Sequence, residues 1–509
     1  MKDVRLRCGY SDGSKPSAWF VDPHCQLHVR VVTASRISWL LTRGLWVTVF
    51  ATAGLMGQDG FAQKVEAPNV VLIVSDDQRH DTIAALGNRS IRTPSIDRLV
   101  QRGSVFLNAI CANPICTPSR GEILTGCSGL RNRVFDLGGA LEPTLATLPE
   151  PFAAKGYATW YCGKWHNDGR PAKHGYAKTR GLFTSGGGKW ASPQLDYRGQ
   201  RVTGYQGWVF RTDSDVPLPQ LGVGLTPTIS HVIADAAIDV IQTSTQPFLL
   251  HVNFTAPHDP LLIPEGKAYE YSSDQIPLPA NFVAAHPFDH GNLDGRDEQV
   301  LPPPRTEQAV RADLAAYYSV ITHLDEQVGR ILDALDQQTL TDRTIVVFCS
   351  DHGLAMGSHG LRGKQNQYEH TIRVPLILAG PGIPSGQQLS GQAYLRDLFP
   401  TLCELAGLEV PDVDGRSQGP VLKGEKDRMY EFTVGYFRDS QRMIRTDRWK
   451  LIHYPLIDQM QLFDLQADPL EKTNLADQPR HRQLRDHLSK QLNDWLAEQR
   501  SKTIAASAP

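Results

Sequence analysis

Side chains that can bind metal ions or transfer protons follow directly after four short apolar segments of the chain. The segments are residues 69–74, 156–162, 247–254 and 344–349. Each is rich in β-branched or aromatic residues, as buried strands are. The side chains that follow them are those of Asp76, Asp77, Lys164, His166, His258, Asp351 and His352.

Helical patterns alternate with these segments. The longest, from about Glu307 to Asp336, repeats apolar residues on one face, and a shorter pattern covers residues 96–105. The alternation predicts an α/β fold in which a large, mostly parallel sheet is sandwiched by helices. In such sheets ligands bind beyond the carboxyl ends of the strands, so the polar side chains should meet at one edge. This convergence predicts a catalytic site there.

Three of these side chains are carboxylates that can gather one divalent cation. Asp76, Asp77 and Asp351 form an oxygen-rich set, which favours calcium or magnesium over zinc, and His352 is a fourth candidate ligand. A single Asp at a strand end is more often a turn residue or a helix cap. Adjacent carboxylates repel each other unless a cation lies between them, so metal binding is the better interpretation of the group.

A second candidate site begins at Cys116, in the run Cys-Thr-Pro-Ser-Arg that ends at Arg120. Taken alone, this is a small buried Cys at a helix start. The run, with the helical pattern that follows it to Gly126, resembles the signature of the type I sulfatases, which belong to the alkaline-phosphatase-like superfamily. The resemblance implies that Cys116 is oxidised after translation to formylglycine (3-oxoalanine) by a maturation enzyme.

The resemblance extends from Asn69 to about Leu475 and assigns further roles. Lys164 and His166 resemble the sulfate-binding Lys and the His that contacts the nucleophile. Lys364 resembles the second catalytic Lys, His258 the His near the leaving-group oxygen, and Arg120 the Arg that holds the formylglycine. A single Lys is more often a solvated surface charge. The order of these residues, in matching local motifs, favours the catalytic interpretation.

The resemblance also implies the chemistry. A divalent cation, Ca²⁺ in preference to Mg²⁺, would be held by Asp76, Asp77, Asp351, His352 and the modified Cys116. One hydroxyl of the hydrated aldehyde would attack sulfur, an acid would protonate the departing alcohol, and the second hydroxyl would expel sulfate. His258 is the leading acid candidate and His166 a candidate for assisting the aldehyde step.

Three positions depart from the family pattern. Cys127 replaces the basic residue that usually follows Thr-Gly, Glu122 adds a polar group to the same helix, and His352 stands where many members have Asn. An Asp-His pair does occur in the iduronate-2-sulfatase-like branch.

Composition suggests an exported protein of two parts. Residues 1–62 have the pattern of a signal peptide with a long n-region, and their apolar run is too short for a stable membrane span. A true start further downstream and a membrane-anchored N-terminus are the alternatives, and export with cleavage is the favoured interpretation. We expect a catalytic domain over 63–424, a C-terminal antiparallel sheet with a covering helix over 425–500, and a disordered tail over 501–509. Export would place the protein in the periplasm or outside the cell.

Charge and cysteine content exclude two further classes. The formal net charge is −2, and −5 without residues 1–62, so nucleic acid is not an expected partner. Six of the eight cysteines follow residue 62, and conversion of Cys116 would leave an odd number, which argues against a disulfide framework.

Three functions fit these observations. The first is hydrolysis of a sulfate monoester on a sulfated saccharide. The second is a phosphonate or phosphate ester hydrolase of the same superfamily. The third is a non-catalytic protein that binds sulfated glycans with an unmodified Cys116.

Overall fold

The computed structural model describes residues 67–506, apart from 265, 268 and 269. The predicted signal peptide over 1–62 lies outside the described residues. Among the described helices, none is both long and apolar enough to cross a membrane.

The largest element is a ten-stranded sheet in the order β10-β2-β11-β9-β1-β8-β3-β4-β7, with β12 paired to β2. The pairs β9-β1, β1-β8, β8-β3 and β3-β4 are parallel, as is β12-β2. The pairs β11-β9, β11-β2, β10-β2 and β4-β7 are antiparallel. The bounds are β1 Asn69–Ser75, β2 Gly103–Ile110, β3 Ala158–Lys164, β4 Lys178–Ser185, β7 Trp208–Arg211, β8 Phe248–Asn253, β9 Thr344–Ser350, β10 Arg373–Val374, β11 Leu376–Ala379 and β12 Gln387–Tyr394.

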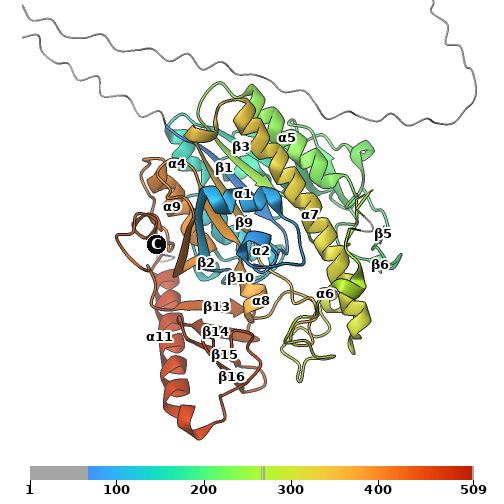
Figure 1. Ribbon diagram of the computed structural model, residues 1–509. Coiled ribbons are helices and arrows are strands. Elements are labelled where there is room, and N and C mark those ends of the chain that lie inside the picture. Colours follow the sequence, from blue (N-terminus) through green and yellow to red (C-terminus); the bar gives the residue numbers. More distant parts are fainter. Residues whose placement is uncertain (1–66, 265, 268–269, 507–509) are drawn as a thin grey trace, which may run out of the picture. The chain divides into compact units, whose positions relative to one another are not determined.

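Helices cover both faces of this sheet. Figure 1 shows α5 and α7 on one side and α4 and α9 on the other. Alternate residues of β1 serve the two layers: Val71 and Ile73 pack with α1, α5 and α7, and Val70 and Leu72 pack with α2, α4 and α9. The helix bounds are α1 Pro94–Arg102, α2 Cys116–Thr125, α3 Gly129–Asn132, α4 Pro149–Ala154, α5 Ile229–Thr243, α6 Arg296–Gln299, α7 Glu307–Gln337, α8 Glu369–Ile372, α9 Leu398–Leu405 and α10 Gly419–Leu422. The predicted fold class is confirmed.

The four strands predicted from apolar segments lie side by side as β9, β1, β8 and β3. Their carboxyl ends therefore meet at one edge, as predicted. The long helix is confirmed as α7, which begins where the Thr306 side chain accepts a hydrogen bond from the Ala309 N–H. The shorter predicted helix was too long. It ends at Arg102, because Gly103 already pairs in β2, where a Cβ would lie 2.1 Å from the Leu378 carbonyl oxygen.

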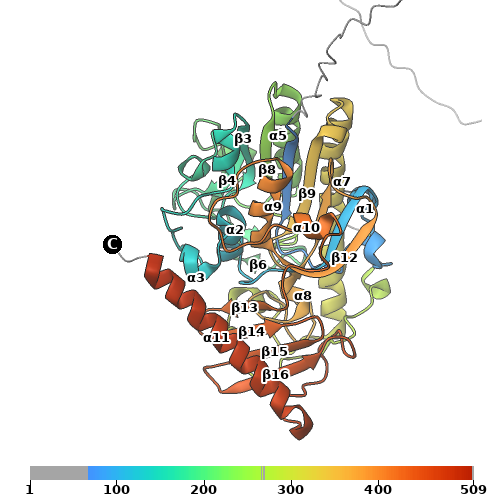
Figure 2. The ribbon, with the colours of Figure 1, turned by 90° about the vertical axis from the view of Figure 1, so that its left-hand side faces the viewer.

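The C-terminal part forms a separate four-stranded antiparallel sheet in the order β13-β14-β15-β16. Its strands are β13 Thr433–Phe437, β14 Gln441–Arg445, β15 Trp449–Tyr454 and β16 Gln459–Asp464. Helix α11, Arg482–Ala506, runs along this sheet (Figure 2) and buries Leu488 and Leu492 against it. Helix α11 continues past Ser501, whose hydroxyl donates to the Ala497 carbonyl, to residue 506, and the boundary expected for the disordered tail stays a prediction. Residues 507–509 lie outside the described part.

Two long insertions carry little regular structure. Among the described residues, the first insertion, 186–207 between β4 and β7, holds the two-stranded sheet of β5 Gln194–Leu195 and β6 Arg201–Val202. The second, 254–306 between β8 and α7, holds a short 3-10 turn at Ser273–Gln275 and α6. The cysteines from Cys111 to Cys403 are all buried and free, so the expectation against a disulfide framework holds for the described residues.

Gly163 lies directly before Lys164, the polar residue that ends β3. It has φ of +84°, a left-handed conformation, and it lies at the register shift between β3 and β4. A Cβ at this position would lie 2.0 Å from the carbonyl oxygen of Asn253 in β8. Only glycine therefore allows β3 and β8 to stay paired while the next residue, Lys164, turns toward the strand ends.

We expect Gly163→Ala to destabilise the protein more than Gly156→Ala, which is a matched control. Gly156 has nearly the same φ, +83°, but a Cβ there meets nothing within 4 Å. The control carries only backbone strain of about 1–3 kcal/mol, whereas Gly163→Ala adds a clash with backbone. The midpoint of thermal unfolding should fall clearly further for Gly163→Ala. Equal midpoints would contradict this role for Gly163.

Candidate active site

The end of β1 supplies two buried carboxylates. Asp76 and Asp77 are both fully buried, and Asp77 has left-handed backbone with φ of +72°. The backbone N–H of Asp77 donates to Oδ1 of Asp351, 3.1 Å away, which follows β9. This bond ties the ends of two neighbouring parallel strands together. The three carboxylates predicted to share a cation are therefore brought to one place.

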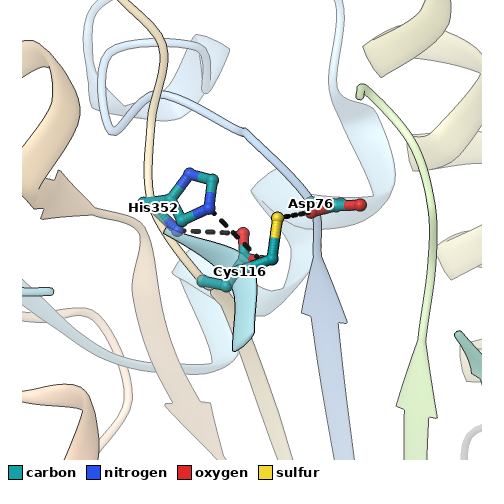
Figure 3. A group of neighbouring side chains, drawn as sticks. Asp76, Cys116 and His352 are labelled. Atoms are coloured by element: carbon teal, nitrogen blue, oxygen red, sulfur yellow. Dashed lines mark hydrogen bonds and ion pairs between the residues drawn. The ribbon is translucent and has the colours of Figure 1, made fainter. Parts of the chain in front are cut away.

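Cys116 begins α2 and points into the same place. Its Sγ lies 3.6 Å from Oδ1 of Asp76 and 3.2 Å from Nζ of Lys364. Figure 3 shows Cys116 and Asp76 meeting from different elements, with His352 beside them. Burial raises the pKa of the Cys116 thiol, but the charges of Lys164, Lys364 and His352 outweigh burial and hold it well below its ordinary value. The surroundings therefore favour negative charge at this position.

Three buried cations surround these acids, each paired with one of them. Lys164 Nζ lies 2.6 Å from Asp76, Lys364 Nζ lies 2.8 Å from Asp77, and an Arg120 nitrogen lies 2.9 Å from Asp351. The side chains of Lys164 and Asp76 have no exposed surface, and that of Arg120 is 5% exposed. Each pairing fixes the direction of a cation without solvent, which preorganises positive charge around Cys116.

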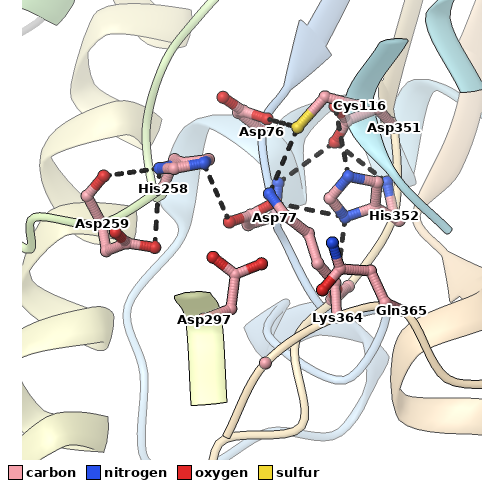
Figure 4. A network of polar contacts seen from close by, with 12 residues as sticks. Asp76, Asp77, Cys116, His258, Asp259, Asp297, Asp351, His352, Lys364 and Gln365 are labelled. Carbon is pink, nitrogen blue, oxygen red and sulfur yellow. Dashed lines mark hydrogen bonds and ion pairs between the residues drawn. The ribbon is translucent and has the colours of Figure 1, made fainter. Parts of the chain in front are cut away.

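His258 and His352 lie on opposite sides of Asp77 (Figure 4). Nε2 of His258 is 3.8 Å from Oδ2 of Asp77, and its Nδ1 is 3.6 Å from Oδ1 of Asp259. Asp259 is in turn held by Arg296 at 2.6 Å. Burial and the Lys364 charge lower the pKa of His258, but Asp77 and Asp259 outweigh them and raise it above its ordinary value. The imidazole is therefore biased toward its protonated form.

His166 follows β3, two residues after Lys164. Its ring makes an edge-on contact with Trp208, with ring centres 5.0 Å apart, and its backbone carbonyl accepts a bond from the Thr117 hydroxyl next to Cys116. Burial, reinforced by the Lys164 charge, lowers the pKa of His166 to about 4. The two histidines thus have opposite bias, with His166 neutral and able to accept a proton.

The donors near Cys116 fit a divalent cation. One donor atom from each of Asp76, Cys116, Asp351 and His352 lies within 4.8 Å of the others. Oδ2 of Asp77 and Nε2 of His352 are buried and make no hydrogen bond to the described residues. Buried polar atoms without a hydrogen bond are rare, and a cation would satisfy both. The carboxylate-rich donor set suits a hard ion.

Sequence reasoning missed several residues of this site. Tyr205, Asn253 and Asp259 each bond a predicted residue: Tyr205 donates to Oδ2 of Asp76 at 2.7 Å, and Asn253 accepts from Arg120. Asp259 directly follows His258, which is a signal that sequence reasoning could have used. Tyr205 carries no such signal, because it lies in an irregular insertion.

Two of the departures noted above have structural partners. Glu122 is buried and bonds Arg396 at 3.0 Å and the Tyr436 hydroxyl at 2.7 Å, so it links α2 to the C-terminal sheet. Cys127 is fully buried, and burial raises the pKa of its thiol to about 12.

Comparison with known proteins gives the family. Residues 68–408 match the family described as Sulfatase, and residues 357–498 match the family described as N-sulphoglucosamine sulphohydrolase, C-terminal. The chain belongs to the sulfatase family. It is 31% identical over 444 residues to a choline-sulfatase of Rhizobium meliloti (strain 1021), covering 81% of this chain and 83% of that protein. This sulfatase is accordingly a sulfuric ester hydrolase of the alkaline-phosphatase-like superfamily.

Solved structures share its fold. The phosphonate monoester hydrolase of Agrobacterium radiobacter superposes with a TM-score of 0.71 at 24% identity, covering 85% of this chain and 96% of that one. A 2-O GAG sulfatase superposes with a TM-score of 0.67 at 24% identity, covering 86% and 94%. At this identity the two likenesses establish the fold.

We expect Tyr205→Phe to lower kcat roughly tenfold, since the hydroxyl makes a charge-assisted hydrogen bond to Asp76. The ring, 7% exposed and packed edge-on against His258 and Trp208, is retained. Thermal unfolding should therefore shift little. Tyr197→Phe is the matched control, because Tyr197 lies in the same insertion and its buried hydroxyl has no hydrogen-bond partner in the described chain. An unchanged kcat in Tyr205→Phe would refute this role.

Proposed function

We propose that this sulfatase removes sulfate from a sulfated saccharide by means of a formylglycine made from Cys116 and a bound Ca²⁺ ion. The observation that carries the proposal is the position of Cys116, 3.6 Å from Asp76 and 3.2 Å from Lys364, among three buried carboxylates and three buried cations. A cysteine kept only for packing needs no such surroundings.

Two groups supply chemistry that unmodified side chains lack. The cation, held by Asp76, Asp77, Asp351 and His352, supplies Lewis-acid stabilisation of negative charge. The hydrated aldehyde at position 116 supplies a nucleophilic hydroxyl and a second hydroxyl that allows sulfate to leave.

The chain's own cations hold the sulfate group. Negative charge builds up on the sulfate and leaving-group oxygens as the ester S–O bond breaks. Lys164, Lys364 and Arg120 are fixed by their carboxylate partners, so little reorganisation is needed when the charge appears. Arg120 also donates to Asn253, which fixes its second edge.

The two histidines divide the proton transfers. His258, fixed through Nδ1 by Asp259, presents Nε2 toward Asp77 and is placed to give a proton to the departing alcohol oxygen. His166, on the other side, is placed to accept the proton released at position 116. Overall one water is consumed, and the products are the alcohol and sulfate.

A saccharide is the substrate class that the similarities favour. The family match over residues 357–498 is to the C-terminal part of N-sulphoglucosamine sulphohydrolase, whose name is that of an enzyme acting on a sulfated sugar. We further propose that residues 1–62 direct export and that the catalytic domain ends near residue 424. The phosphonate monoester hydrolase likeness is one of fold and favours no second function.

The deciding experiment is the mass of the proteolytic peptide that contains Cys116, from protein produced together with a maturation enzyme. We expect a peptide lighter than the thiol form that reacts with an aldehyde-trapping amine. The same protein should hydrolyse an aryl sulfate faster than the matched aryl phosphonate, and Cys116→Ala should abolish turnover.

A peptide with an intact thiol, despite modification of a control sulfatase in the same cells, would refute the proposed nucleophile. A preference for the phosphonate would instead favour the ester hydrolase alternative. Cys403→Ala is a matched control, because Cys403 is buried and free in α9 and serves no proposed step.

Removal of the cation should abolish activity and lower the midpoint of thermal unfolding, because an ion that binds only the folded state stabilises it. Elemental analysis should find a single Ca²⁺ per chain, and Ca²⁺ should restore the midpoint better than Mg²⁺. Asp351→Asn should lose the ion, whereas Asp342→Asn, at a short exposed turn before β9, should retain it. An unchanged metal content in Asp351→Asn would contradict the assignment.

A further inference from the structure

A cavity of about 700 Å³ lies outside the catalytic centre, between α3, the turn that joins β13 to β14, and the last part of α11. Its size is that of a ligand site. The charged residues lining it are Arg133, Arg438, Arg442, Arg500, Asp136 and Asp439. Arg133 is paired with Glu142 at 3.0 Å and Arg438 with Asp136 at 2.7 Å, so the less neutralised cations of the lining are Arg442 and Arg500.

Part of this positive charge is not neutralised. No ion pair joins Arg500 to any residue of the described chain. The pKa of the Arg442 guanidinium is lowered, mainly by burial and further by the nearby charge of Arg500. The ion-pair partner of Arg442 is Asp439, whose side chain is 94% exposed and therefore screened by water. An anion bound between Arg442 and Arg500 would relieve their repulsion.

The remaining lining is apolar. Leu130, Phe135, Tyr436 and Leu496 line the cavity, and Phe135 is 41% exposed. A concave site that combines apolar faces with a few fixed cations suits a ring with an apolar face and negative substituents. A sulfated or carboxylated sugar has both.

The walls of the cavity are bonded to the segments that carry the catalytic residues. The Phe135 carbonyl accepts a bond from Asn113, and the Tyr436 N–H donates to Ala112, both just before Cys116. The Gln441 side chain, at the start of β14, donates to the carbonyl of Gln365, which follows Lys364. Figure 2 shows α3 and the end of α11 near β13, below α2. The walls of the cavity are thus hydrogen-bonded to the segments that precede Cys116 and follow Lys364.

We propose that this cavity is a second binding site for the substrate, which takes an anionic sugar of a sulfated glycan chain while another sugar of the same chain presents its sulfate ester to Cys116. The inference rests on the proposed function and names its substrate as an oligomer with several negative charges. Arg442 and Arg500 bind the sulfate or carboxylate of that sugar. The affinity of the protein for a glycan therefore depends on the charge and the length of the glycan chain.

Binding of sized heparin oligosaccharides, from disaccharide to octasaccharide, tests the proposal without turnover. In Cys116→Ala protein, calorimetry should show that affinity rises once the chain is long enough to fill both sites. Arg500→Gln should weaken binding of the longer chains roughly three- to tenfold, and Arg442→Gln together with Arg500→Gln should remove the gain with length. Added salt should weaken the long chains more than the disaccharide.

Lys490→Gln is the matched control, since it removes one positive charge from an exposed position of the same helix, away from the cavity. Its affinities should equal those of the parent. Equal affinity of the Arg500→Gln and parent proteins for every chain length would overturn the proposal, as would an absence of length dependence.

The two proposals fail in different ways. Turnover of an aryl sulfate by protein with intact Cys116 reports on the catalytic centre alone. If that turnover is absent while oligosaccharide binding still depends on Arg500, the proposed function fails and the binding site stands. If turnover is present and the affinity for oligosaccharides does not depend on Arg500, the proposed binding site is wrong and the proposed function stands.

Discussion

The balance of buried charge at the carboxyl edge of the sheet is the constraint on which this structure depends. Asp76 has no exposed surface and contacts Lys164, Arg120 and Tyr205. Taking one such charge out of water costs several kcal/mol, so each must keep its partner. Removal of any one partner leaves another charge uncompensated. The elements that carry these residues are therefore locked to one another, which a catalytic centre requires and a surface cluster would not.

The backbone is shaped to meet this requirement. Parallel pairing of β9, β1, β8 and β3 brings four strand ends together, and α2 presents Cys116 to them. The C-terminal sheet adds a second anchor, because Lys450 and Arg445 hold the buried Glu369 of α8. Tyr436 of β13 likewise bonds the buried Glu122 of α2, which is also paired with Arg396 between β12 and α9. The small sheet thus stabilises the elements on either side of the catalytic centre.

The parts predicted from the sequence are those whose pattern has a single physical meaning. A continuous apolar run such as Asn69–Ser75 must be buried on both faces, so its strand and the position of its polar end could both be predicted. The edge strand β12, which pairs parallel with β2, could not. Strand β12 contains Gln387, Gln388 and Ser390, because it pairs only with β2 and stays partly exposed, and its pattern resembles a loop. Tyr205 shows the same limit, since its role depends on an irregular backbone that brings it to Asp76.

This difference follows from what each region must do. Cleavage of a sulfate ester needs the same buried charges whatever alcohol carries the sulfate, so those residues lie in short motifs at strand ends. Recognition of the rest of the substrate needs surface that differs between substrates, and the surface proposed for it here is made by the β13–β14 turn, α3 and α11. An arginine such as Arg500 has no motif around it, and in a helix its sequence is that of any solvated face. Arg500 becomes a candidate binding residue only because the fold brings it to the same cavity as Arg442. The class of reaction could therefore be predicted from the sequence, whereas a candidate surface for the substrate is found only in the folded structure.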